Sequence, residues 1–186
     1  MLNASFDREA ITVKIMGVLG ALGAIASLAM LFFGGTIGSL FIAIANAVLA
    51  FICFVEVEDE KPFFAASLGL IALAEVISLI LGKGSFSDNA YVIIISIIAH
   101  FGMIAYILWN RISRFKAIWI GAVCAGDIIW RAIRIPAVVM SKLGGTISNP
   151  DVKATVTVAV IYVLVGVIPT LAVTLFLFTG ALDYGN

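Results

Sequence analysis

Charged side chains are scarce in this chain. They make up 12% of its 186 residues, about half the share that is usual in a soluble domain, whereas hydrophobic residues make up 63%. The mean hydropathy is +1.20. Helices in lipid can be apolar on every side, because they have no water to face. The composition therefore excludes an ordinary soluble protein and predicts one transmembrane domain over residues 1–186.

The few charges also favour neither sign. Eleven basic residues balance eleven acidic ones, so no net field attracts the chain to nucleic acid. We expect the lipid bilayer as the main surroundings and no nucleic-acid partner.

Residues that carry metal, haem or hydrolase chemistry are few as well. His100 is the single histidine, which excludes a bis-histidine haem or a histidine-rich metal site within the chain, and the HExxH, GxSxG and P-loop patterns are absent. Cys53 and Cys124 lie in apolar stretches and have neither metal-site nor redox spacing, so we expect them to pack as small hydrophobic residues. We expect no cofactor. An enzyme is the least favoured class, with Asp127 and His100 as its one conceivable acid–base pair.

Long apolar runs are what the chain has in abundance. A bilayer core of about 30 Å needs about 20 helical residues to cross it. Segments rich in glycine, proline or charge separate the runs, as loops do. We predict an all-α, polytopic bundle of six transmembrane helices, at residues 11–33, 37–55, 63–81, 91–109, 118–139 and 155–179.

Positive charges in the loops predict the orientation of this bundle. With the N-terminus in the cytoplasm, the inner loops hold six Lys and Arg residues and the outer loops hold three. Positive charge concentrates on the cytoplasmic side of membrane proteins. We therefore expect a multi-pass protein of the cell membrane with both termini in the cytoplasm. The acidic loop at residues 56–60 is either a solvated charge run or a site for a divalent cation, and the first use is the commoner one.

The three odd-numbered runs share a weak repeat. Each contains a glycine that is followed, six residues later, by a second recurring position. The pairs are Gly20 with Ala26, Gly69 with Glu75, and Gly121 with Asp127. The spacing of about fifty residues predicts three parallel helical hairpins. Coincidence is the alternative, because glycine and alanine are common in this chain.

Six polar residues lie inside the predicted spans, where each charge at a helix centre costs on the order of 2.5–3.5 kcal/mol. They form the candidate pathway or buried polar cluster: Asn46, Glu75, His100, Asp127, Arg131 and Arg134. Asp127 and Arg131 are four residues apart, and Arg134 continues the same helix face. With Glu75 as the second acid, the two arginines are balanced. Histidine ordinarily titrates near pH 6.5, which makes His100 the titrating member.

Two functions fit this cluster. In the first, a transporter or channel-like protein moves a small solute or ion, with an arginine as counter-charge and Glu75 or Asp127 as the carrier of a coupling proton. In the second, the chain is a non-catalytic subunit of a larger membrane complex, for example a respiratory one, and the Asp127–Arg131 pair is a structural clasp. A glycine strip at residues 17, 20 and 23 then seats either a helix of this chain, a second copy or a partner subunit.

Two prolines interrupt the last two runs. A proline leaves the carbonyl four residues before it without its helical donor, so Pro136 frees Ala132 and Pro169 frees Val165. A freed carbonyl either coordinates a cation or solute, or it accepts a hydrogen bond from a neighbouring helix and the proline marks only a bend.

Overall fold

The structure, a computed structural model, describes residues 5–32, 37–81, 90–109, 113–142 and 150–183. At residues 5, 78, 90, 131–142, 150–155, 158–159, 162–163 and 183 it describes the backbone alone. Six α-helices follow one another: α1 (Ile11–Phe32), α2 (Ile37–Phe54), α3 (Lys61–Leu81), α4 (Ala90–Leu108), α5 (Arg114–Lys142) and α6 (Pro150–Thr179). Two short strands flank them, β1 (Ser5–Phe6) and β2 (Leu182–Asp183).

A helix is present at each of the six predicted runs, and the main differences lie at the ends of the last two. Helix α5 begins at Arg114 and ends at Lys142, outside the predicted 118–139, and α6 begins at Pro150 instead of residue 155. Hydropathy marks only the part of a helix that is apolar, whereas backbone hydrogen bonding continues through polar residues. Proline is also well suited to the first position of a helix, where its missing N–H leaves no carbonyl without a donor.

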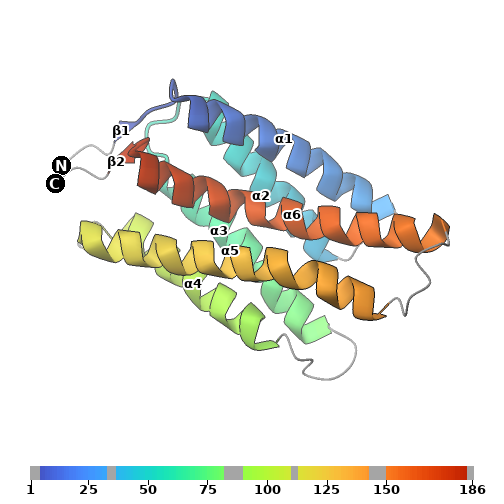
Figure 1. Cartoon of the computed structure of the whole chain (residues 1–186). Helices are drawn as coiled ribbons and strands as arrows, with labels where there is room; N and C mark the ends of the chain where they lie inside the picture. The colour runs from blue at the N-terminus through green and yellow to red at the C-terminus, as the bar shows by residue number, and fades with distance from the viewer. Residues whose placement is uncertain (1–4, 33–36, 82–89, 110–112, 143–149, 184–186) are drawn as a thin grey trace.

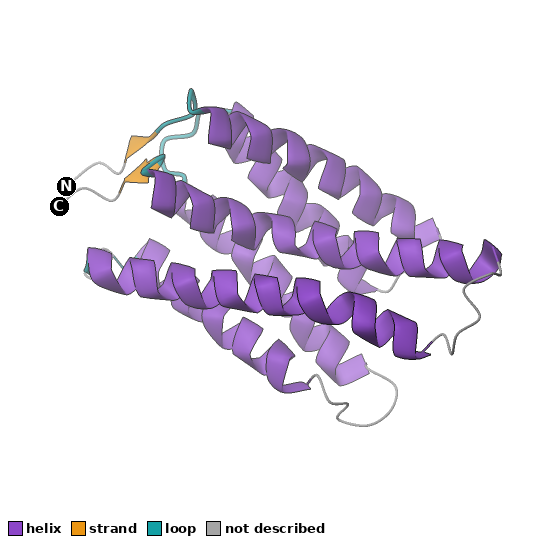
Figure 2. Ribbon diagram, in the orientation of Figure 1, coloured by secondary structure: helices purple, strands orange, loops and turns teal. Residues whose placement is uncertain are grey.

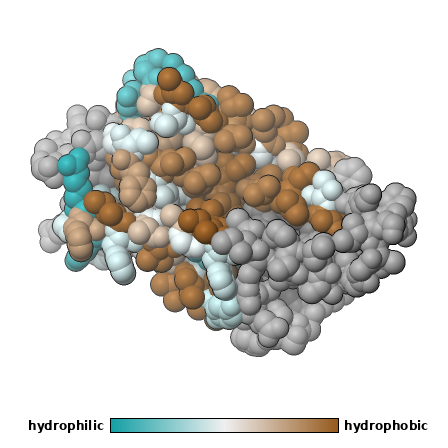
Figure 3. Space-filling view, viewed as in Figure 1, coloured by the Kyte–Doolittle hydropathy of each residue, from teal (hydrophilic) through white to brown (hydrophobic). Residues whose placement is uncertain are grey.

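Among the described residues, four helices are long and apolar enough to cross a membrane, namely α1, α2, α3 and α4. The apolar stretch described in α6, Leu164–Thr179, is shorter. Large apolar side chains point outward from several helices, with Ile25 and Ile98 each 65% exposed. Figure 3 shows such residues covering much of the visible face of the described part. This surface is compatible with a membrane location, since lipid would cover what water would not.

The helices run alternately up and down, and α6 lies between α1 and α5 on the near side of the bundle (Figure 1). Each helix packs against the next in sequence, while α6 packs against α1, α2, α3 and α5. A hydrogen bond from His100 also joins α4 to α6.

The glycine strip of α1 is occupied by α2. A Cβ atom placed on Gly17 would lie 2.8 Å from Cβ of Cys53, and one on Gly23 would lie 2.8 Å from Oδ1 of Asn46. A Cβ atom does not approach another heavy atom that closely, so a larger residue at either position would force its neighbour to shift. The strip seats a helix of this chain, which decides between the alternatives that the sequence left open.

The segments that flank the helices meet at one end of the bundle (Figure 2). Strands β1 and β2 pair antiparallel, with Phe6 opposite Leu182. The Phe6 ring contacts those of Phe64 and Phe176, with centroids 5.2 and 5.4 Å away. This aromatic cluster ties the segment before α1 to α3 and α6.

The acidic loop between α2 and α3 contacts the segment before α1 at the same end of the bundle. Arg8 donates to Oε1 of Glu60 at 2.8 Å and to the Ile52 carbonyl at 3.3 Å. Oδ1 of Asp59 accepts the backbone N–H of Lys61 at 3.1 Å and so caps α3. Two of the acidic residues therefore have structural partners.

Candidate functional site

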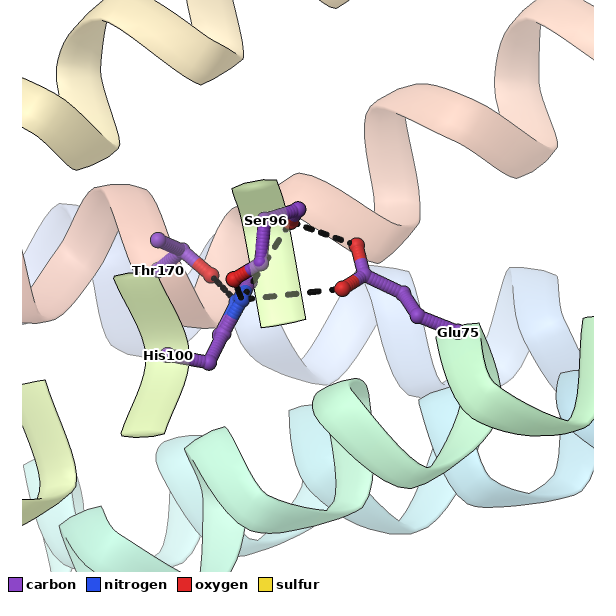
Figure 4. Close-up of polar contacts among 4 residues, drawn as sticks. All are labelled: Glu75, Ser96, His100 and Thr170. Atoms are coloured by element: carbon purple, nitrogen blue, oxygen red, sulfur yellow. Dashed lines mark hydrogen bonds and ion pairs between the residues drawn. The ribbon is translucent and has the colours of Figure 1, made fainter. Parts of the chain in front are cut away.

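Four polar side chains meet inside the bundle from three helices (Figure 4). Glu75 comes from α3, Ser96 and His100 from α4, and Thr170 from α6 directly after Pro169. Ser96 and His100 are one helical turn apart, so they lie on the same face of α4. We call these four residues the α3–α4–α6 polar network.

Hydrogen bonds join the members in a line. Oγ of Ser96 donates to Oε1 of Glu75 at 2.8 Å and lies 3.3 Å from Nδ1 of His100. The Nδ1 atom is 2.7 Å from the Ser96 carbonyl and 3.7 Å from Oε2 of Glu75. At the other edge of the ring, Nε2 is 2.5 Å from Oγ1 of Thr170.

The backbone carbonyl of Ser96 fixes the tautomer of the histidine. A carbonyl can only accept, so Nδ1 of His100 carries a proton. In the neutral ring Nε2 then accepts the hydroxyl proton of Thr170, whereas in the charged ring Nε2 donates to the same oxygen. His100 therefore keeps a hydrogen bond to Thr170 in both protonation states.

The network is shielded from the surroundings. His100 is 3% exposed, and Ser96 and Thr170 are also buried. The Glu75 side chain is 13% exposed. Because little water reaches the network, the interaction between the Glu75 carboxylate and the imidazole is weakly screened.

Asn46 has a different use. It is fully buried, and its Nδ2 atom donates to the carbonyls of Ile42 at 2.9 Å and Val165 at 3.0 Å. The Val165 carbonyl is the one that Pro169 deprives of its helical donor. Here the freed carbonyl accepts from a neighbouring helix. No hydrogen bond described in the structure joins Asn46 to Glu75 or His100, so the predicted cluster is divided.

The remaining predicted site residues lie on α5. Asp127 is partly buried, and both Asp127 and Glu75 are close enough to the buried Cys124 to interact with it electrostatically. Arg131, Arg134 and Pro136 lie in the helix, but the structure describes only the backbone at these residues. The pairing of these arginines with Asp127 and Glu75 stays a prediction.

Sequence reasoning missed Ser96 and Thr170. Ser96 had a visible signal, because it is the one polar residue between Tyr91 and His100 and stands one turn before the histidine. Thr170 had none, since only the packing of α6 against α4 brings it to the ring.

The described residues contain no group of three His, Cys, Asp or Glu side chains arranged to hold a metal ion. No protein-family model, curated protein or solved structure matches the chain.

Proposed function

We propose that the protein carries protons across the membrane, alone or coupled to a small solute, through the α3–α4–α6 polar network. The observation that carries the proposal is the buried His100 ring, held between the Glu75 carboxylate and the Thr170 hydroxyl. Ionisable groups inside a membrane are expensive and commonly belong to a transport route. Histidine suits this use because it binds and releases protons near neutral pH.

In this proposal each group of the network takes part in one step of proton transfer. A proton that reaches Thr170 displaces the hydroxyl proton onto Nε2, which makes the ring positively charged. The ring then releases the Nδ1 proton to Glu75, either directly or through the Ser96 hydroxyl. Glu75 passes the proton onward, and transfer of the remaining ring proton from Nε2 to Nδ1 through a bridging water restores the first tautomer. One proton enters and one leaves, so the network returns to its starting charge.

Six membrane spans with both termini in the cytoplasm form part of this proposal. Helices α5 and α6 have 29 and 30 residues. At 1.5 Å per residue each is about 45 Å long, more than the bilayer core of about 30 Å. The pairing of β1 with β2 at one end supports an even number of spans, and the excess of basic residues in the loops at that end supports the cytoplasmic side.

The three-hairpin arrangement is likewise proposed. A Cβ atom placed on Gly20 would lie nearest the Asn46 carbonyl on α2, one on Gly69 nearest Ile104 on α4, and one on Gly121 nearest Phe178 on α6. Each recurring glycine thus faces the second helix of its own hairpin. In this arrangement Asp127 is the counterpart of Glu75, and Arg131 and Arg134 supply the charge that holds an anionic solute.

Proton flux into liposomes tests the function. The purified protein is reconstituted with an internal pH-sensitive dye, and a potassium diffusion potential drives protons inward. We expect Glu75→Gln and Thr170→Val to reduce the flux at least about tenfold, since each removes a proton-transfer group. Thr174→Val is the matched control, because that buried threonine donates only to the Thr170 carbonyl. Unchanged flux in folded Glu75→Gln and Thr170→Val would contradict the proposal.

The alternative, a non-catalytic subunit of a membrane complex, loses one support. The glycine strip is filled by α2 and is not available to a partner. A partner subunit could instead bind an outward face of α5. Trp119 is exposed there, and a Cβ atom placed on Gly126 would meet nothing within 4 Å. Absence of flux in the wild-type protein, together with a stoichiometric partner of different sequence after mild extraction, would favour this alternative.

A further inference from the structure

The interface between α1 and α2, which we call the α1–α2 seam, has two unlike halves. In the half nearer the termini, the Cβ positions of Gly17 and Gly20 lie 2.8 Å from Cβ of Cys53 and 3.1 Å from the Asn46 carbonyl oxygen, and the tight contact ends at Gly23, whose Cβ position lies 2.8 Å from Oδ1 of Asn46. Helices in such contact leave no room for another molecule. This half is closed.

The half away from the termini contains buried polar atoms that the protein does not satisfy. Among the described residues, Oγ of Ser27, Oγ of Ser39 and Oδ1 of Asn46 have no hydrogen-bond partner, and all three residues are at most 1% exposed. A buried oxygen without a partner is costly, and each one in a folded protein calls for an explanation.

The register of the seam aligns these three atoms. Ser39, Asn46 and Cys53 recur every seven residues, so they form one stripe on α2, and the last two face the α1 glycines. Ser27 is one turn beyond Gly23, which lies against Asn46. Because the helices are antiparallel, Ser27 is level with residues 42–43 of α2. At 1.5 Å per residue, Ser27 is then about 5 Å along the axis from both Asn46 and Ser39.

An interval of about 5 Å is too long for a direct hydrogen bond and close to two hydrogen bonds end to end. The three oxygen atoms therefore suit small bridging molecules. Oδ1 of Asn46 accepts only, while each serine hydroxyl both donates and accepts. None of the three carries a charge, and a dehydrated cation would need several further oxygen ligands. Water fits this donor set.

We propose that the half of the α1–α2 seam away from the termini binds a short file of water molecules that ends at Asn46. There the water reaches α6 beside the Val165 carbonyl, five residues before Thr170. In this proposal the water molecules give protons access to the polar network. That role rests on the proposed proton transport. The closed half of the seam stops the file from crossing the membrane.

Thiol accessibility tests the file, and the chain supplies its own control. Cys53 lies in the same seam but in the closed half. We expect the S–H group of Ser27→Cys, in a background with Cys53→Ala and Cys124→Ala, to exchange with D2O at least about tenfold faster than that of Cys53 does when it is the only cysteine, because the exchange needs contact with water alone. The shift of the S–H stretching band is followed by infrared spectroscopy in lipid nanodiscs. Equal rates would overturn the proposal.

Thermal unfolding of Ser27→Ala and Ser39→Ala gives a second reading. If water satisfies the hydroxyls, removal of one breaks the file, and we expect the melting temperature to fall. If the hydroxyls are dry, their removal relieves a buried unpaired group and the melting temperature rises, which would overturn the proposal. Neither measurement depends on proton flux, so failure of the proposed transport and failure of the file are distinguishable.

Discussion

Asn46 and His100 are two buried polar residues that reach the same helix on either side of Pro169, yet they have different uses. Asn46 donates to the Val165 carbonyl, which the proline has left without a donor. His100 instead meets the Thr170 hydroxyl and, at its other edge, Ser96 and Glu75. The first contact ends at a backbone atom that cannot titrate. The second belongs to a line of side chains that can exchange protons.

The comparison shows that two buried polar residues of one helical bundle can have unlike partners. What separates the two is the chemistry of the partner. A backbone carbonyl needs only a fixed donor, and an amide supplies one. A carboxylate beside an imidazole can share protons, and hydroxyl groups extend the line.

The largest effect is expected from His100→Asn. Asparagine keeps a donor near the Ser96 carbonyl but cannot take up a proton, so we expect proton flux to fall by about a hundredfold or more. The liposome assay measures this, and circular dichroism confirms that the variant is helical. Flux within a factor of about two of wild type would show that His100 is a packing residue like Asn46.

Asn46→Leu should lower the stability of the protein. It removes two hydrogen bonds and leaves the Val165 carbonyl unpaired, at a cost of about 1–3 kcal/mol in the free energy of unfolding. We expect Pro169→Ala to restore part of that loss, because alanine supplies the backbone N–H that proline lacks. A double-mutant cycle by denaturant unfolding in mild detergent measures the coupling. Strictly additive effects would contradict this use of Asn46.

Gly23→Ala tests the close contact that positions Asn46. The added Cβ would lie 2.8 Å from Oδ1 of Asn46, so we expect a loss of about 1–3 kcal/mol. Gly69→Ala is the control, because its Cβ would meet only Ile104 at 3.9 Å and alanine favours a helix. We expect that variant to be as stable as wild type or slightly more so. Similar losses in both would mean that the α1–α2 contact is looser than the structure shows.

Arg8→Met tests the ion pair that closes the terminal end. The Arg8 and Glu60 side chains are 21% and 13% exposed, so water screens the pair in part. We expect a loss of about 0.5–1 kcal/mol, read from thermal unfolding. Proton flux should not change, since this pair lies at the end of the bundle and not in the network.

The smallest effect is expected from the exposed pair of Glu9 and Lys14. The hydrogen bond from Lys14, and then its charge, lower the pKa of Glu9 below its ordinary value. A lowered pKa means that the pair contributes stability above the ordinary pKa of glutamate and loses it as the pH falls through the lower value. An NMR titration should show the Glu9 pKa rise in Lys14→Gln, with no measurable change in melting temperature. An unchanged pKa would show that the pair does not form in solution.

The sequence predicted much of the fold, because the number and place of the helices follow from local apolar runs. It did not predict the ends of α5 and α6, where polar residues continue the helix. For the site, the high cost of placing polar groups in lipid singled out Asn46, Glu75 and His100. We expected these residues to share one cluster, but Asn46 donates a hydrogen bond to the backbone carbonyl of Val165.

Residues 1–186 by themselves determined the apolar character of the chain, its helical class and which polar residues fall inside the apolar runs, because each depends on composition or on spacing along one helix. The tertiary structure decided which helix packs on the glycine strip and which atom donates a hydrogen bond to the Val165 carbonyl. It also decided that Thr170 lies within hydrogen-bond distance of His100. Those contacts join residues up to 119 positions apart, and only the packing of α6 inside the bundle brings them together.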